Sequence, residues 1–65
     1  MKILAINSDL MTRVRILLVL ENGENVVITK PDKKSGLALC ERWKPDKIIY
    51  DLGAAQELAS EKRPA

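Results

Sequence analysis

The sequence predicts an α/β fold in which three strands and three helices alternate along one small domain. Short runs of apolar residues recur at three places, each followed by polar or turn-forming residues, and segments with helical periodicity separate them. This alternation favours parallel strands joined by right-handed crossovers, with the helices lying on the faces of one sheet. The chain has 65 residues, and a chain of that length buries only about 60% of its unfolded surface.

The strands are predicted from composition. Ile3 to Ile6 is an uninterrupted apolar run, which is typical of a strand buried on both faces. Val26 to Thr29 is rich in β-branched residues, which favour strands. Ile48 to Tyr50 is the third apolar run, and it ends at Asp51. The carboxyl ends of these strands are the expected position of any binding site, because ligands of open α/β sheets bind there.

The helices are predicted from their caps and from apolar spacing. Ser8 or Asp9 can cap the first helix, and Asp32 can cap the second. Proline restricts the residue before it, so the second helix is expected to end before Pro45. The expected helices cover about residues 10–21, 33–44 and 54–62.

The first helix is apolar on two opposite sides. One side carries Leu10, Met11, Val14, Leu17 and Leu18, and the other carries Ile16, Val19 and Leu20. A surface helix normally has one apolar stripe, so the second side predicts a further packed surface. Together with the third strand, this helix provides most of the interface candidates, which are Ile16, Val19, Leu20, Trp43, Ile48, Ile49 and Tyr50.

The remaining composition excludes several classes of protein. A single cysteine, Cys40, and the absence of histidine leave no material for an intrachain disulfide or a Cys/His zinc site. The 11 basic and 9 acidic residues are interspersed, which does not indicate a nucleic-acid partner. No run approaches the roughly 20 apolar residues of a membrane span, and no secretory signal is evident. We therefore expect a cytoplasmic protein without a membrane or nucleic-acid partner.

The second expected helix carries Cys40 and Trp43, a candidate nucleophile and a candidate interface residue. Cys40 lies at helical spacing from Leu37 and Trp43, which predicts a buried thiol, and without histidine there is no usual base to activate it. Trp43 is open to two interpretations, a cover for the core or an anchor in an interface.

The chain resembles the first half of a response-regulator receiver domain over about residues 2–52. The resemblance rests on the strand from Lys2 to Ile6 with the polar triplet after it, on Asp32 at the start of the second helix, and on the stretch from Pro45 to Leu52. It implies a three-layer flavodoxin-like half domain, βαβαβα with parallel sheet order 2-1-3. Residues 1–65 are then a single truncated receiver-like domain.

The resemblance also implies a phosphorylation site that this chain retains only in part. Its phosphoacceptor position falls on Asp51, whereas its two metal-binding carboxylates fall on Asn7 and Ser8, which are neutral. Asp9 is a possible remnant of the metal site, but one carboxylate makes a poor magnesium site. Asp51 has an alternative role as a helix cap.

The main functional hypothesis is therefore a non-catalytic receiver-like module for signalling or protein interaction, without a cofactor. Its expected partner is a protein, either a second copy in a homodimer or a larger signalling protein. The alternative is a phosphoacceptor receiver domain of a two-component system that uses Asp51 with Mg²⁺. A third hypothesis, DNA binding, would use two adjacent basic pairs, Lys33-Lys34 and Lys62-Arg63.

Overall fold

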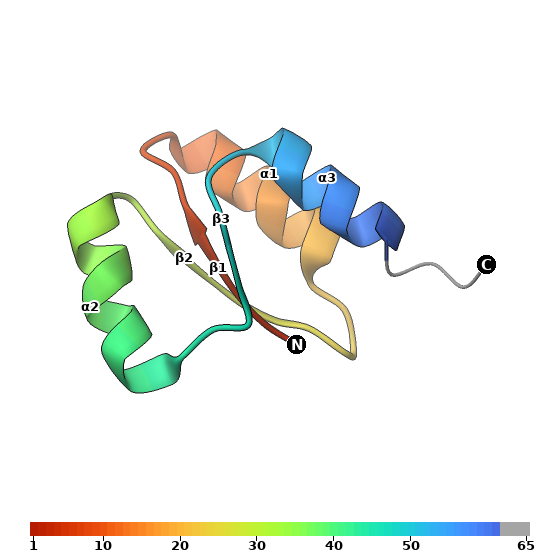
Figure 1. Cartoon of the computed structure of the whole chain (residues 1–65). Helices are drawn as coiled ribbons and strands as arrows, with labels where there is room; N and C mark the ends of the chain where they lie inside the picture. The colour runs from red at the N-terminus through yellow and green to blue at the C-terminus, as the bar shows by residue number, and fades with distance from the viewer. Residues whose placement is uncertain (62–65) are drawn as a thin grey trace.

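The chain forms a three-stranded parallel sheet with helices on both faces (Figure 1). The structure is a computed structural model that describes residues 1–61. The strand order β2-β1-β3 and the alternation βαβαβα confirm the predicted α/β half domain. The elements are β1 (Lys2–Ile6), α1 (Leu10–Leu20), β2 (Val26–Lys30), α2 (Lys33–Trp43), β3 (Lys47–Ile49) and α3 (Leu52–Glu61).

Most predicted boundaries differ from the structure by one or two residues, and hydrogen bonds account for the differences. α1 ends one residue early because Glu21 takes the C-cap position and donates its backbone N–H to Leu17. α3 begins at Leu52 rather than Ala54, because the Asp51 carboxylate accepts the Ala54 N–H and caps the helix there. The expected basic pair Lys62-Arg63 lies outside the described residues.

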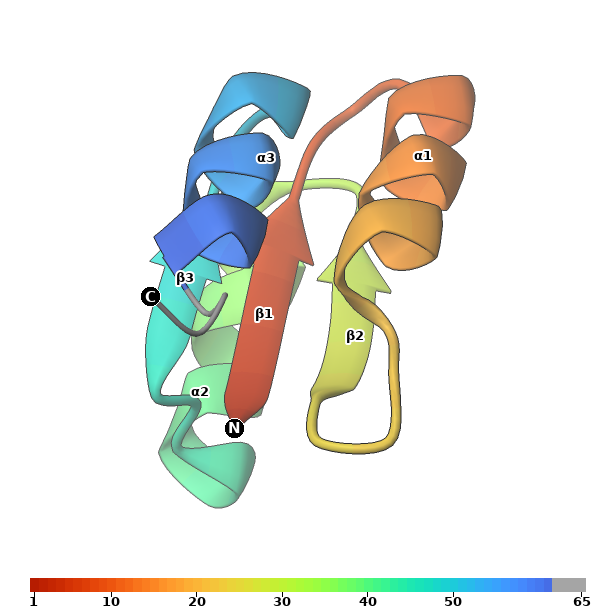
Figure 2. The same ribbon diagram turned by 90° about the vertical axis from the view of Figure 1, so that its right-hand side faces the viewer.

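β1 is the centre of the molecule, since it pairs with both other strands and is covered on both faces. Figure 2 shows α1 over the side of β2 and α3 over the side of β3, with α2 on the opposite face. The core between the sheet, α1 and α3 contains Ile3, Ala5, Ile16, Leu20, Ile49, Ala55 and Leu58. Each fully buried large aliphatic side chain contributes about 1.5–3 kcal/mol.

The two-sided α1 helix turns the Ile16 and Leu20 side toward the sheet. Both side chains are completely buried and Val19 packs against the same core, so the prediction of Ile16 and Leu20 as interface residues is wrong. The Arg13 guanidinium donates to the Asn7 carbonyl oxygen at 2.6 Å, a contact consistent with this rotation of the helix. The opposite side remains in solvent, where the exposed fractions are 62% for Leu10, 58% for Met11, 38% for Val14 and 78% for Leu18.

α2 approaches the sheet through a glycine rather than through leucine. Gly36 is buried against the Ile6 side chain, and the half-buried Cys40 and Trp43 follow it at helical spacing. Leu37, one position further round the helix, is 51% exposed. The prediction of a buried Cys40 is met only in part, because Cys40 is half-buried, and the prediction of Leu37 on the packed face is wrong.

α3 lies on the same face of the sheet as α1 and packs against it. A right-handed crossover from β3 to a further parallel strand beyond it would place the connecting helix on the face of α2. The position of α3 therefore departs from the expected half receiver. On the other face, α2 packs on β1 and β2, and Ile48 of β3 is left 39% exposed.

We predict that Gly36→Val lowers the free energy of unfolding by about 1–3 kcal/mol, because the added side chain overfills a packed contact. A Cβ atom at Gly36 would lie 2.8 Å from Cγ1 of Ile6. Gly23→Val is the matched control, since nothing lies within 4 Å of a Cβ there, and it should change stability by less than about 0.5 kcal/mol. Urea denaturation measures both variants, and equal effects would contradict the close approach of α2.

Candidate functional site

The acidic residues at the carboxyl ends of the strands act as helix caps. Asp9 accepts the Thr12 N–H at 2.8 Å, Asp32 accepts the Ser35 N–H at 2.8 Å, and Asp51 accepts the Ala54 N–H at 2.7 Å. Each acceptor lies three residues before its donor, which is the usual geometry of an N-cap. The three carboxylates that could do chemistry at this edge therefore each start a helix.

Asn7 joins the ends of β1 and β3. Its side-chain Nδ2 donates to the Tyr50 carbonyl oxygen at 2.7 Å, and its Oδ1 accepts the Asp9 N–H at 2.9 Å. These two bonds together assign the orientation of the amide, whose N–H donors point toward the end of β3. A cation needs oxygen ligands, so an amide N–H facing this position is unfavourable for metal binding.

The remaining positions of the predicted site are exposed and do not converge. Ser8, Asp9 and Asp51 are all exposed, and Asp51 uses one carboxylate oxygen for the cap of α3. Within residues 1–61, no three His, Cys, Asp or Glu side chains form a group that could hold a metal ion.

Local hydrogen bonds also shape the electrostatics of this edge. The Thr12 hydroxyl, followed by the Thr12 backbone N–H, holds the pKa of Asp9 below its ordinary value. The Ser35 hydroxyl and backbone N–H lower the pKa of Asp32 in the same way. Both groups are fully exposed caps, and donation to the charged carboxylate is the main physical cause.

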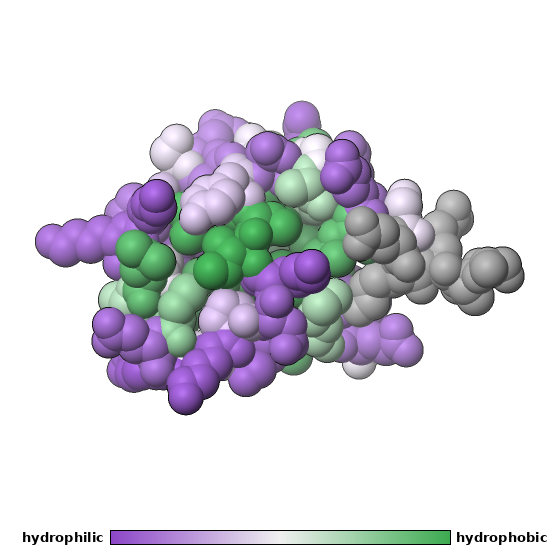
Figure 3. Space-filling view, in the orientation of Figure 1, coloured by the Kyte–Doolittle hydropathy of each residue, from purple (hydrophilic) through white to green (hydrophobic). Residues whose placement is uncertain are grey.

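The surface at β3 carries exposed apolar side chains. Ile48, in β3, is 39% exposed, and Tyr50, the residue after the strand, is 50% exposed. Figure 3 shows hydrophobic side chains gathered at the centre of the face along which β3 runs in Figure 1. The outer side of α1 forms a second apolar surface. Of the predicted interface residues, Ile48 and Tyr50 are therefore exposed, whereas Ile49 is buried in the core at 7% exposure.

Trp43 lies at the end of α2, where it is half-buried. The Lys2 ammonium lies 5.9 Å from the centre of the Trp43 ring and donates to the Trp43 carbonyl oxygen at 2.8 Å. These contacts tie the end of α2 to the start of β1, and both interpretations of Trp43 stay open. Sequence reasoning could not find this pair, because the two residues are 41 positions apart.

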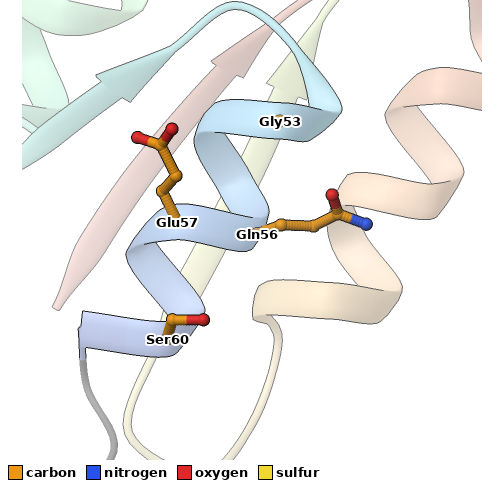
Figure 4. Close-up of a pocket in the computed structure, with 4 residues that line it drawn as sticks. All are labelled: Gly53, Gln56, Glu57 and Ser60. Carbon is orange, nitrogen blue, oxygen red and sulfur yellow. The ribbon is translucent and has the colours of Figure 1, made fainter.

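Two hollows lie beside α3. The first, of about 580 Å³, is lined by Gly53, Gln56, Glu57 and Ser60. The side chains of Gln56 and Glu57 point in different directions (Figure 4). The second, of about 220 Å³, lies between β3 and α3 and is lined by Lys47, Ile48, Ile49, Ala54, Glu57 and Leu58. No hydrogen bond joins Glu57 to Ser60 in the described structure, so the first hollow lacks an activated hydroxyl.

Comparison with protein-family models, with curated proteins and with solved structures finds no match for this chain. Among the described residues, no helix combines the length and the apolar character needed to cross a membrane.

We predict that Asn7→Asp combined with Ser8→Asp creates a magnesium site that the wild-type chain lacks. Without Mg²⁺ the variant should melt below the wild type, since a carboxylate replaces the amide that donates to the Tyr50 carbonyl. Millimolar Mg²⁺ should raise the Tm of the variant and leave the wild type unchanged, because paired carboxylates attract this ion. NaCl at equal ionic strength is the control, and a wild-type response specific to Mg²⁺ would refute the prediction.

We also predict that acid weakens the fold through Asp9 and Asp32. A carboxylate whose pKa is lowered on folding stabilises the fold above its unfolded pKa of about 3.9, and this contribution is lost as the pH falls through the folded pKa. Asp9→Asn with Asp32→Asn keeps the cap acceptors but removes the titration. The urea midpoint of this variant should fall less than that of the wild type between about pH 5 and about pH 2. An equal fall would contradict the assignment.

Proposed function

We propose that this chain is a non-catalytic, receiver-like protein-interaction module in signalling, with a cytoplasmic location. The observation that carries the proposal is the exposed apolar surface at β3, where Ile48 and Tyr50 remain in solvent beside an open strand edge. Contiguous apolar surface of this kind is typical of sites where proteins bind one another. A partner must offer an apolar surface, and both a second copy of the chain and a larger signalling protein can do so.

The polar residues at the carboxyl edge support a non-catalytic role. Asn7 places an amide N–H against the Tyr50 carbonyl oxygen, at the position where the resemblance implies a carboxylate ligand for a cation. Transfer of a phosphoryl group to a carboxylate normally depends on a divalent cation that neutralises the two anions. The proposal accordingly includes no cofactor and no enzymatic activity.

The second candidate function is a phosphoacceptor receiver domain that uses Asp51 and Mg²⁺. One observation favours it: Asp51 is exposed at the end of β3, and its Oδ1 alone accepts the hydrogen bond that caps α3. The other carboxylate oxygen therefore remains accessible to a phosphodonor. DNA binding has less support, because Lys33 and Lys34 are exposed at the start of α2 without a groove or an aromatic residue between them.

We predict that the chain gains no phosphoryl mass when it is incubated with Mg²⁺ and acetyl phosphate, because Asn7 and Ser8 supply no charged metal ligand. Intact-mass spectrometry under mildly acidic conditions measures the outcome. The Asn7→Asp, Ser8→Asp variant is the positive control for the method. A stable wild-type adduct that disappears in Asp51→Asn would favour the second candidate function and overturn the first.

A further inference from the structure

We propose that the edge of β3 pairs with the same edge of a second copy, antiparallel about a two-fold axis at Ile49. The inference rests on the proposed function, in that it names the partner of the exposed β3 surface. The product is one continuous sheet of six strands, three from each copy. Strand addition at an open edge combines backbone hydrogen bonds with side-chain contacts, and a two-fold axis makes one surface complementary to itself.

The backbone of β3 has the alternation that this pairing needs. The Asp46 N–H donates to the Lys2 carbonyl oxygen at 2.7 Å, and the Tyr50 carbonyl oxygen accepts from Asn7, so these groups face β1. Successive residues of a strand direct their backbone groups to alternate sides. The backbone groups of Lys47 and Ile49 therefore point away from β1, toward the open edge of the sheet.

Charge complementarity selects the register. When Ile49 lies opposite Ile49 of the second copy, Lys47 lies opposite Asp51, and the two-fold axis creates this pair twice. Lys47 and Asp51 are both exposed, and within residues 1–61 neither makes an ion pair. Opposite charges directly across an antiparallel pair are stabilising, whereas an edge lysine disfavours other strand partners.

The same register pairs the exposed apolar side chains. Ile48 lies directly opposite Tyr50 of the second copy, again twice. Ile48 is in register with Leu4 of β1, and Tyr50 follows Ile48 at the two-residue spacing that keeps side chains on one face of an extended strand. Ile48 is 39% exposed and Tyr50 is 50% exposed, so the pairing removes apolar area from water. An aromatic side chain against a β-branched one is a favourable cross-strand pair.

The alternative register centred on Ile48 pairs Ile48 with itself but loses the charged pair and the Ile48–Tyr50 pairs. A two-fold axis at Ile48 would place Lys47 opposite Ile49, and Tyr50 opposite Asp46. It would also place Asp51 opposite Pro45, which has no N–H to donate to the neighbouring strand.

The outer side of α1 is a weaker surface for a second copy. Leu10, Met11, Val14 and Leu18 are exposed there, but the helix contains Arg13 and Arg15 and no acidic residue. The acidic residues nearest this surface, Asp9 and Glu21, lie at the two caps of α1, and Asp9 already accepts the capping hydrogen bond. At the β3 edge, by contrast, the chain itself supplies both the Lys47 and the Asp51 of each charged pair.

We test the register by disulfide formation in a Cys40→Ser background. Residues directly opposite in a pair without mutual hydrogen bonds have Cα atoms about 4.5 Å apart, a separation within the range of a disulfide. An equal mixture of Ile48→Cys and Tyr50→Cys chains should therefore cross-link under oxidised glutathione, whereas each chain alone should not. Both positions are exposed, so the substitutions leave the core intact. Cross-linking of Ile48→Cys with itself would indicate the register centred on Ile48 and would overturn the proposed pairing.

Sedimentation equilibrium tests the charged pair. Lys47→Glu should raise the dimer Kd about tenfold, because each Lys47–Asp51 attraction becomes a repulsion. Lys34→Glu is the matched control at an exposed lysine of α2, and it should leave the Kd unchanged. A monomer at all concentrations together with no cross-link would overturn the inference. That result would leave the proposed function intact, since the acetyl phosphate experiment tests it separately.

Discussion

The structure depends on one constraint, which is that β1 must be kept from water on both faces. Ile3, Leu4 and Ala5 have no exposed surface, and successive residues of a strand point to opposite faces. One helix layer cannot bury both sets of side chains. α1 and α3 therefore cover one face and α2 covers the other.

The same constraint explains why the polar residues at the carboxyl ends of the strands have a structural role. Three helices must start within a few residues of the strand ends, so Asp9, Asp32 and Asp51 accept N–H groups that would otherwise lack partners. Asn7 then ties β1 to the end of β3 with an amide. This chain holds its strand ends together by hydrogen bonds, and the exposed apolar residues Ile48 and Tyr50 lie in β3 and just after it.

Strand composition and cap residues were sufficient to predict the order of elements, because a buried central strand and an N-cap are local patterns. The strand order β2-β1-β3 was expected from the resemblance to a receiver domain. The capping role of Asp51 was one of two interpretations that the sequence left open. The packed face of α2 was predicted wrongly, because the hydrophobic pattern of the sequence indicates Leu37 as a core residue. Gly36 packs on Ile6 instead, and a glycine gives no hydrophobic signal.

The sequence by itself determined which segments become strands and helices, because periodicity and capping act within a few residues. Only the tertiary structure decided which side of α1 is buried, because both sides are apolar and the choice depends on packing against the sheet and α3. It also decided that α3 lies beside α1. That placement follows from contacts between segments more than 30 residues apart, and it leaves Ile48 and Tyr50 exposed at the edge of the sheet.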